Sequence, residues 1–268
     1  MYELNKKRYE VLDDYIAKVP FNMMMAQSVL LGHTNGKVFV DSRENPQSFY
    51  IIHSYGMSYL CGESSNEEFN RALFEYFKGT CMTHVRKKDE WLQAFPREWD
   101  NILSKLCQEG AAIQYSRLNF KFDADRFYEK HDEVSKSIND ANHCVCSMPV
   151  EMLFDINGSV VPKDYWKTPE QFASMAKAFS VMIDGKPVST AFCSARHDDR
   201  FEIGIETHPD YQGKGLAYLA CAKLIEYCIE NKLEPVWSCR LENTGSVKLA
   251  EKLGFAEILR MPYYYIPL

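Results

Sequence analysis

The chain has 268 residues, 46% of them hydrophobic and 25% charged, and a formal net charge of −6. This composition is that of a globular protein large enough for one large or two small domains, and no apolar run reaches the roughly 20 residues that span a membrane. The acidic charge argues against a nucleic-acid partner held through its phosphates, and the N-terminus lacks a signal peptide's apolar centre. We therefore expect a cytoplasmic protein that binds neither nucleic acid nor membrane.

The nine cysteines are scattered without a C-x-x-C pair, and Cys144 and Cys146 are too closely spaced for the usual zinc knuckle. Reduced, mostly buried thiols and no metal are therefore predicted.

The first part of the chain predicts helices and a small antiparallel meander. Residues 2–18 and 23–31 have helical spacing, and turn signals separate three short strand patterns at 37–41, 49–53 and 57–61. This half is therefore expected to contain an α+β domain.

The next segment begins with a capping box formed by Ser65 and Glu68, which predicts a helix that ends at Gly79. The basic run 84–88 is expected to be a solvated loop. Further spacing predicts a helix, a strand and a helix, at 97–109, 111–122 and 125–138. The polar stretch 139–143 then marks a boundary, so we predict two domains, 1–140 and 141–268.

The second half predicts three antiparallel strands. Thr168, followed by Pro169 and Gln171, is typical of a helix start. Strand patterns follow at 179–183, 187–195 and 201–207, and the Asp184-Gly185 pair between the first two is a strong hairpin signal. A long helix, a strand at 235–239, a helix capped by Asn243 and a strand at 258–266 complete the chain.

The segment after the 201–207 strand predicts an anion site. Gly213 and Gly215 stand at the start of the long helix, where unpaired N–H groups carry a partial positive charge. Glycines remove side chains that would keep a phosphate away from these groups. The segment therefore suits a pyrophosphate.

Two motifs carry a family resemblance. Gln212-x-x-Gly215-x-Ala217 resembles the Q/R-x-x-G-x-G/A signature of the GCN5-related N-acetyltransferase (GNAT) superfamily, and the segment from Asn243 to Phe255 resembles a second signature of that family. The resemblance covers roughly residues 145–268 and implies a mixed α/β fold, with a central, mostly antiparallel sheet flanked by helices. The N-terminal domain is either a separate α+β domain or a degenerate half of the same fold.

The resemblance also implies acetyl-coenzyme A as cosubstrate and no metal. The glycine loop would hold the pyrophosphate, and the pantetheine arm would enter a gap between the 201–207 and 235–239 strands. The residues implied in cofactor binding are Ile205, Thr207, Gln212, Gly213, Lys214, Gly215, Leu216, Ala217, Asn243 and Ser246.

Acetyl transfer to an amine calls for a base, because an alkylamine has a pKa of about 10.4. Glu206 and Glu202 share one face of the 201–207 strand and are the two candidate catalytic residues, with His208 a third, more typical of a turn. The family's frequent general-acid tyrosine is replaced by Ala250. The terminal run 263–265 offers tyrosines, for which ordinary strand packing is expected.

The sequence therefore predicts an acetyl-coenzyme A-dependent N-acetyltransferase acting on a small-molecule or peptide amine. A noncatalytic acyl-coenzyme A sensor is the alternative, favoured by Ala250 and the unassigned base. An aminoacyl-tRNA-dependent transferase is a second alternative, disfavoured by the acidic charge. The acceptor and the formation of a homodimer are left open.

Overall fold

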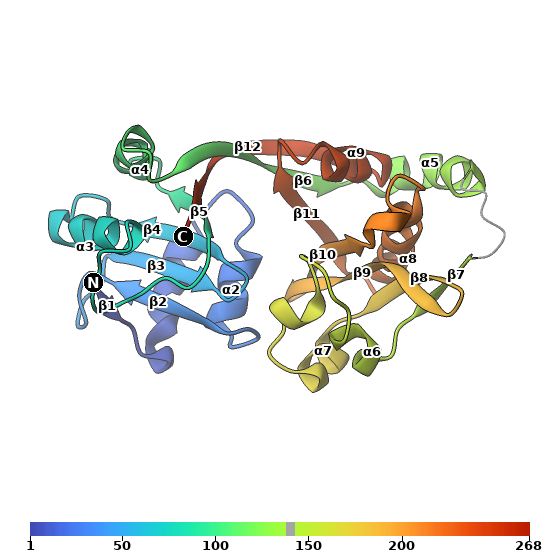
Figure 1. Ribbon diagram of the computed structural model, residues 1–268, viewed down its shortest axis with the longest axis horizontal. Coiled ribbons are helices and arrows are strands. Elements are labelled where there is room, and N and C mark those ends of the chain that lie inside the picture. Colours follow the sequence, from blue (N-terminus) through green and yellow to red (C-terminus); the bar gives the residue numbers. More distant parts are fainter. Residues whose placement is uncertain (138–142) are drawn as a thin grey trace. The chain divides into compact units, whose positions relative to one another are not determined.

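The computed structural model describes residues 1–137 and 143–268, and its chain forms two compact units (Figure 1). The first unit contains residues 1–118, 240–242 and 260–268, and the second contains 119–239 and 243–259. The units therefore do not follow a single cut in the sequence, and the division into domains at residue 140 stays a prediction. The predicted boundary stretch lies, except for His143, outside the described residues.

The first unit contains strands in the order β1-β2-β3-β4-β5-β12. Neighbouring strands here pair antiparallel, except β4 and β5, which are parallel. The strands are β1 (Tyr2–Glu3), β2 (Gly36–Val40), β3 (Ser48–His53), β4 (Met57–Gly62), β5 (Glu90–Phe95), and the parts of β6 (Ile113–Phe122) and β12 (Phe255–Ile266) that belong to this unit. The helices are η1 (Lys6–Leu12), α1 (Asp13–Ile16), α2 (Met24–Leu30), α3 (Glu67–Phe77) and α4 (Trp99–Gln108).

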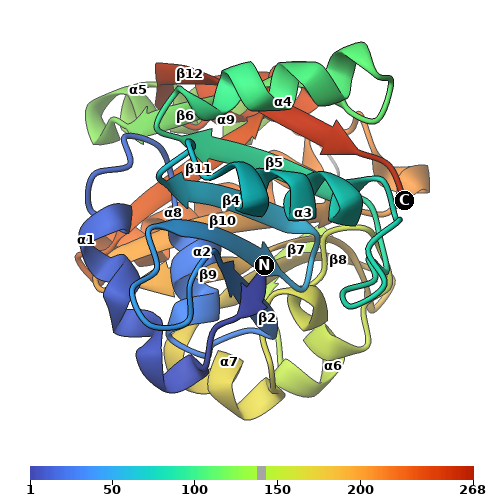
Figure 2. The ribbon, with the colours of Figure 1, turned by 90° about the vertical axis from the view of Figure 1, so that its left-hand side faces the viewer.

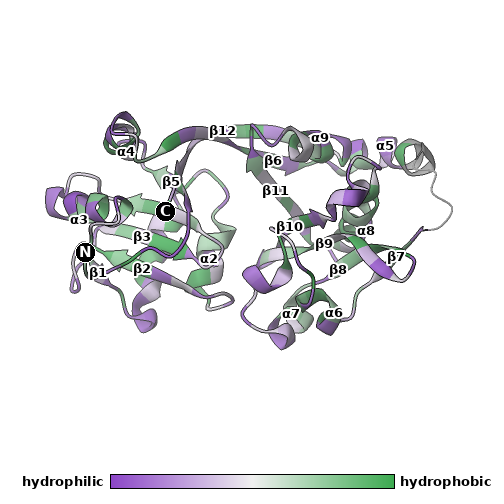
Figure 3. Ribbon diagram, in the orientation of Figure 1, coloured by the Kyte–Doolittle hydropathy of each residue, from purple (hydrophilic) through white to green (hydrophobic). Residues whose placement is uncertain are grey.

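The core of the first unit lies between this sheet and helices α3 and α4, which are in front of the strands in Figure 2. Strands β3 and β4 are coloured mainly as hydrophobic in Figure 3, which is typical of strands covered on both faces. The buried side chains that form this core include Tyr50, Leu60, Phe69, Leu73, Leu92, Trp99, Leu103 and Tyr264.

The predicted meander and helix α2 are confirmed, but two expectations for this unit are wrong and a third holds only in part. Residues 2–18 form a short strand, followed by a 3-10 helix and one α-turn, instead of one helix. The strand forms where Tyr2 pairs with Val40 of β2. Helix α3 is capped by Asn66, whose side chain accepts from the N–H of Phe69, and not by Ser65. The basic run 84–88 is a loop, as expected, but Arg86 within it is buried, and its guanidinium donates to two carbonyls near the C-terminus. Strand β5 was not predicted.

The second unit contains strands in the order β11-β10-β9-β8-β7, antiparallel except for β10 with β11. The strands are β7 (His143–Ser147), β8 (Ala178–Ile183), β9 (Lys186–His197), β10 (Arg200–Thr207) and β11 (Glu234–Arg240). The helices are α5 (Ala124–Ser137), α6 (Val150–Phe154), η2 (Pro162–Asp164), α7 (Pro169–Met175), η3 (Pro209–Tyr211), α8 (Leu216–Glu230) and α9 (Thr244–Lys252). Helix α8 packs against β8, β9 and β10.

The turn and the helix cap predicted for this unit are confirmed. The β8–β9 hairpin turns at Asp184 and Gly185, with φ of 50° and 73°, as a turn with two left-handed residues requires. Thr168 caps α7 and accepts from the N–H of Gln171 over 3.2 Å. Strand β7 and helix α6 were not predicted. The mixed α/β fold with a mostly antiparallel sheet is confirmed.

Two negative findings concern the part of the chain that the structure describes. It contains no helix long and apolar enough to cross a membrane. Its cysteines form no disulfide, and five of the nine are buried.

Candidate functional site

Strands β10 and β11 separate along their length, as the resemblance implied. Their parallel register pairs Arg200, Phe201 and Glu202 with Glu234, Pro235 and Val236. Among the described residues the pairing of these two strands ends there, although β10 continues to Thr207 and β11 to Arg240. A register shift between Glu202 and Ile203 in the β9–β10 ladder marks a bulge at the same point. The extra residue of this bulge is Ser194 of β9, so the irregularity in the ladder lies beside the point where β10 and β11 stop pairing.

The backbone of β10 points alternately to β9 and into this gap. The N–H of His208 donates to the carbonyl of Val188 over 2.9 Å, so the antiparallel alternation directs the backbone groups of Glu206 and Gly204 toward β9. Ile205 and Thr207 therefore direct their N–H and C=O groups to the opposite side. The Thr207 carbonyl accepts from Nε2 of Gln212 over 3.1 Å, which agrees with this direction.

The glycine loop follows directly. Gly213 and Gly215 have φ of 75° and 81°, values that favour glycine, and Gly215 is the N-cap of α8. A Cβ added at Gly213 would meet nothing within 4 Å, so open space lies beside the loop. The first turn of α8 carries no acidic side chain. The exposed loop is therefore followed by a helical turn without an acidic side chain, and its residues fit a pyrophosphate.

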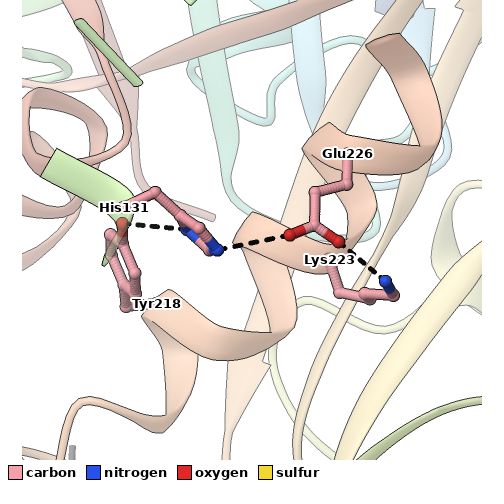
Figure 4. A network of polar contacts seen from close by, with 4 residues as sticks. All are labelled: His131, Tyr218, Lys223 and Glu226. Atoms are coloured by element: carbon pink, nitrogen blue, oxygen red, sulfur yellow. Dashed lines mark hydrogen bonds and ion pairs between the residues drawn. The ribbon is translucent and has the colours of Figure 1, made fainter. Parts of the chain in front are cut away.

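A polar network connects His131 of α5 with Tyr218, Lys223 and Glu226 of α8 (Figure 4). The Tyr218 hydroxyl lies 3.3 Å from Nδ1 of His131, and Nε2 of that ring lies 3.2 Å from the Glu226 carboxylate. Lys223 donates to the same carboxylate over 2.7 Å. Burial raises the pKa of Tyr218 to about 12, so its hydroxyl stays protonated at neutral pH. Since the Tyr218 N–H also donates to Gly215, the network fixes the end of the glycine loop.

Glu202 lies at the point where β10 and β11 begin to diverge. Its side chain is buried, and Oε1 accepts from the hydroxyl of Ser238 on β11 over 3.1 Å. Its backbone carbonyl accepts from the hydroxyl of Ser194 on β9. The carboxyl group therefore connects the two diverging strands.

Glu206 has a different environment. Oε2 accepts three hydrogen bonds, from the N–H groups of Ser159 and Val160, at 3.1 and 2.7 Å, and from the Ser159 hydroxyl at 3.2 Å. A Cβ added at Gly158 would meet the Glu206 side chain at 2.7 Å, so glycine allows this close approach. The carboxylate thus anchors the 158–160 loop to β10.

The second signature positions α9. Asn243 caps this helix as predicted, with Oδ1 accepting from the N–H of Ser246 over 3.2 Å. The Ser246 hydroxyl accepts from Nε1 of Trp237 on β11 over 3.2 Å. Ala250 is fully buried within the helix.

The other candidates have structural contacts. His208 caps the η3 turn and accepts from the N–H of Asp210 over 3.3 Å. The three terminal tyrosines belong to the first unit, where Tyr264 bonds Asp100 and Tyr265 bonds Asp89, at 3.0 and 2.6 Å. Packing on β12 therefore accounts for them. The described residues contain no group of three or more His, Cys, Asp or Glu side chains placed to hold a metal ion.

Comparison with known proteins decides the family. The sequence matches the profile of the family described as GNAT acetyltransferase over residues 18–264. The chain belongs to this family. The match includes most of the N-terminal half, in which we found neither signature.

Individual relatives of this GNAT chain extend along its whole length. An uncharacterized N-acetyltransferase of Bacillus subtilis (strain 168), YdfB, is 26% identical over 99% of this chain and 98% of its own. The crystal structure of a GCN5-related N-acetyltransferase-like protein from Streptococcus suis 89/1591 has a TM-score of 0.73 and 21% identity, covering 96% of this chain and 98% of that one. A tandem GNAT protein from the clavulanic acid biosynthesis pathway has a TM-score of 0.59 and 12% identity, covering 99% and 97%. The two structures support the fold.

Sequence reasoning missed two groups that contact the candidate bases. Ser238 was treated only as a residue of a short strand. Because neighbouring side chains in a strand point to opposite faces of the sheet, its place beside Trp237 could have assigned it to the face opposite to that of Trp237. The 158–160 loop carries no motif, and its contact with Glu206 joins residues 46 positions apart or more.

Proposed function

We propose that this protein is an acetyl-coenzyme A-dependent N-acetyltransferase that transfers the acetyl group to a primary amine. The observation that carries this proposal is the end of β10–β11 pairing at Glu202 and Val236, followed on β10 by the glycine loop. Family membership supports acyl transfer in general, this geometry supports binding of the coenzyme, and the primary amine is the acceptor that the resemblance implies.

The chain's own groups have separable roles in this proposal. The N–H groups of the glycine loop and of the first turn of α8 bind the pyrophosphate, and the loop residues are Gln212, Gly213, Lys214, Gly215, Leu216 and Ala217. The Ile205 N–H, directed into the gap, is placed to donate to the thioester carbonyl and to stabilise its developing charge. Asn243 and Ser246 would support the arm of the cofactor from α9. Positioning therefore supplies most of the catalysis.

The acceptor must lose a proton before or during attack, and two carboxyl groups on β10 are available. Glu206 is half-buried and held by the 158–160 loop, whereas Glu202 is buried where the strands diverge. We propose Glu206 as the base, acting directly or through a water molecule, because its greater exposure leaves it nearer to solvent. Glu202 is the second candidate.

The experiment that tests the proposal measures release of coenzyme A from acetyl-coenzyme A in the presence of a panel of primary amines. Turnover that depends on one class of amine is expected. Binding of acetyl-coenzyme A without turnover on any amine, peptides included, would contradict the proposed activity and leave the binding loop intact.

A noncatalytic acyl-coenzyme A sensor is the second candidate function. Two observations favour it: Ala250 stands where the family frequently has a tyrosine, and all three hydrogen bonds of Glu206 serve the 158–160 loop. A thiolate with a pKa of about 8.5 can leave without a general acid, so the first observation leaves transfer chemically feasible. The turnover experiment separates the two functions.

The N-terminal residues are proposed to be a degenerate half of the same fold. The family match begins at residue 18, and the chain resembles a tandem GNAT protein along nearly its whole length. We propose that this part binds no acetyl-coenzyme A, since no second glycine signature occurs in residues 1–120.

A further inference from the structure

The first unit carries an aromatic and cationic cluster on the face of β5 that is opposite to its core. Leu92 of β5 is in the buried core with Tyr264, so Trp91 and Gln93 point to the other face. There the Trp91 ring stacks on Tyr263 at 5.0 Å between centroids and lies 4.6 Å from Tyr265. The cluster consists of Trp91, Gln93, Tyr115, Arg117, Arg240, Tyr263 and Tyr265.

Two arginines belong to this cluster. The Arg240 guanidinium lies 4.3 Å from the Trp91 centroid and 5.6 Å from that of Tyr115. Arg117 is 9% exposed, lies 5.1 Å from the Tyr263 ring and donates to its hydroxyl over 3.4 Å. Burial raises the pKa of Tyr263 to about 12, against the opposing effect of both guanidinium charges. The positive charges of both arginines therefore act on the phenol of Tyr263, although the protein as a whole has a net charge of −6.

Arg240 is stacked and not paired with a carboxylate. None of the ion pairs formed by the described residues includes Arg240. Stacking uses the face of a guanidinium and leaves its N–H edge for an acceptor. Since that edge forms the fork that matches a carboxylate, the stacked arrangement preorganises a bidentate contact.

Gln93 is an independent sign of a ligand. Its side chain is fully buried, and neither its amide oxygen nor its amide nitrogen has a hydrogen-bond partner in the described part of the chain. Gln93 lies opposite Tyr59 of β4, and the β5–β12 register, continued by one step, places it opposite Tyr263. A buried amide without partners is unfavourable, so its presence beside the arginines is explained if a bound molecule supplies them.

We propose that this cluster is a binding site for a small molecule with a carboxylate attached to an aromatic ring. Arg240 and Arg117 bind the carboxylate, Gln93 donates to it or to a neighbouring polar group, and the half-buried rings of Trp91, Tyr115 and Tyr265 contact the apolar part. The site lies within the first unit and is independent of the proposed acetyl transfer.

Isothermal titration calorimetry with benzoate, on the full chain without acetyl-coenzyme A, tests the site. Benzoate should bind. Benzamide, which has the same ring without the charge, should bind at least about tenfold more weakly, and so should inorganic phosphate. Equal binding of benzamide would show that the rings alone bind, and tighter binding of phosphate would show a general anion site. Absence of heat with millimolar benzoate would refute the proposal.

Matched variants locate the binding. Arg240→Gln should weaken benzoate binding by about tenfold or more, because a bond to a charged fork is lost. Arg43→Gln is the control, since Arg43 is an exposed arginine stacked on Tyr2 at 5.1 Å in the same unit. Equal effects of the two changes would contradict the site.

Gln93→Met separates binding from structure. If the amide is retained for a ligand, this change should raise the melting temperature and weaken benzoate binding, because an unsatisfied buried amide is replaced by an apolar chain of similar volume. A lower melting temperature with unchanged benzoate affinity would show that Gln93 is structural, and would contradict its assigned role.

Discussion

The hydroxyl of Ser238 on β11 donates to Oε1 of Glu202 on β10 over 3.1 Å, two residues beyond the last β11 residue paired with β10. A side-chain hydrogen bond thus connects the two strands just beyond the point where their backbone pairing ends. It limits how far the strands separate at the narrow end of the gap, and so defines where the proposed thioester site begins.

Ser238→Ala should destabilise the protein by about 1–3 kcal/mol, because a buried carboxyl group loses a donor. The measurement is the free energy of unfolding by urea. Ser194→Ala is the matched control, since its hydroxyl donates to the backbone carbonyl of the same residue, Glu202, over 3.2 Å. Its expected cost is smaller, about 0.5–1.5 kcal/mol. An equal or larger cost at Ser194 would show that the carboxyl group does not depend on Ser238.

Gly213→Glu should abolish the increase in melting temperature that acetyl-coenzyme A produces, because the new carboxylate would occupy the open space beside the loop and repel the pyrophosphate. Gly185→Glu is the control: its φ of 73° is close to the 75° of Gly213, and it too has no atom within 4 Å of an added Cβ. Both variants carry the same backbone strain. A folded Gly213 variant that binds with unchanged affinity would show that the loop is not the site.

Asn243→Ala should lower the free energy of unfolding by about 1 kcal/mol, because the cap of α9 is lost, and should also weaken acetyl-coenzyme A binding. Thr168→Ala removes another observed cap in the same unit and should cost a similar amount without affecting binding. If both variants bind like the wild type, Asn243 is purely a cap.

His53 should make stability depend on pH. Burial, aided by the charge of Lys88, lowers its pKa from 6.5 to about 3, and its Nδ1 accepts from the Tyr55 N–H over 3.0 Å. Because the folded state disfavours protonation, the stabilisation is complete above pH 6.5 and is lost as the pH falls toward 3, by about 5 kcal/mol in total. His53→Gln should therefore flatten unfolding free energy between pH 6.5 and 4. An unchanged slope would contradict this assignment.

Parts of the site that depend on residues close together in the sequence were predicted, and parts that depend on distant segments were not. The Asp184-Gly185 turn, the Asn243 cap and the glycine loop depend on neighbouring residues, and each was found. Strand β5 was missed because two of its six residues, Glu90 and Gln93, are polar and yet buried, Glu90 with hydrogen bonds from Tyr50 and Tyr76. Contacts between distant segments, such as that of Glu206 with the 158–160 loop, leave no local pattern.

Glu206→Gln tests the proposed base. The glutamine oxygen can still accept from Ser159 and Val160, so the 158–160 loop should stay in place while the proton acceptor is lost. The cost should therefore fall on kcat, by about 10²–10⁴-fold, with little change in acetyl-coenzyme A affinity, and the acid limb of the pH–rate profile should disappear. Glu206→Ala removes both functions and should lower stability as well.

Glu202→Gln is the matched control for this experiment, since Glu202 is on the same strand but accepts from Ser238 instead of the loop. If Glu202→Gln loses activity while Glu206→Gln retains it, Glu202 is the base and Glu206 is not. Wild-type rates in both variants, with the true acceptor, would show that neither carboxyl group takes the proton. Catalysis would then depend on the positioning of acceptor and thioester by the backbone of β10, and the Ile205 N–H would become its main contributor.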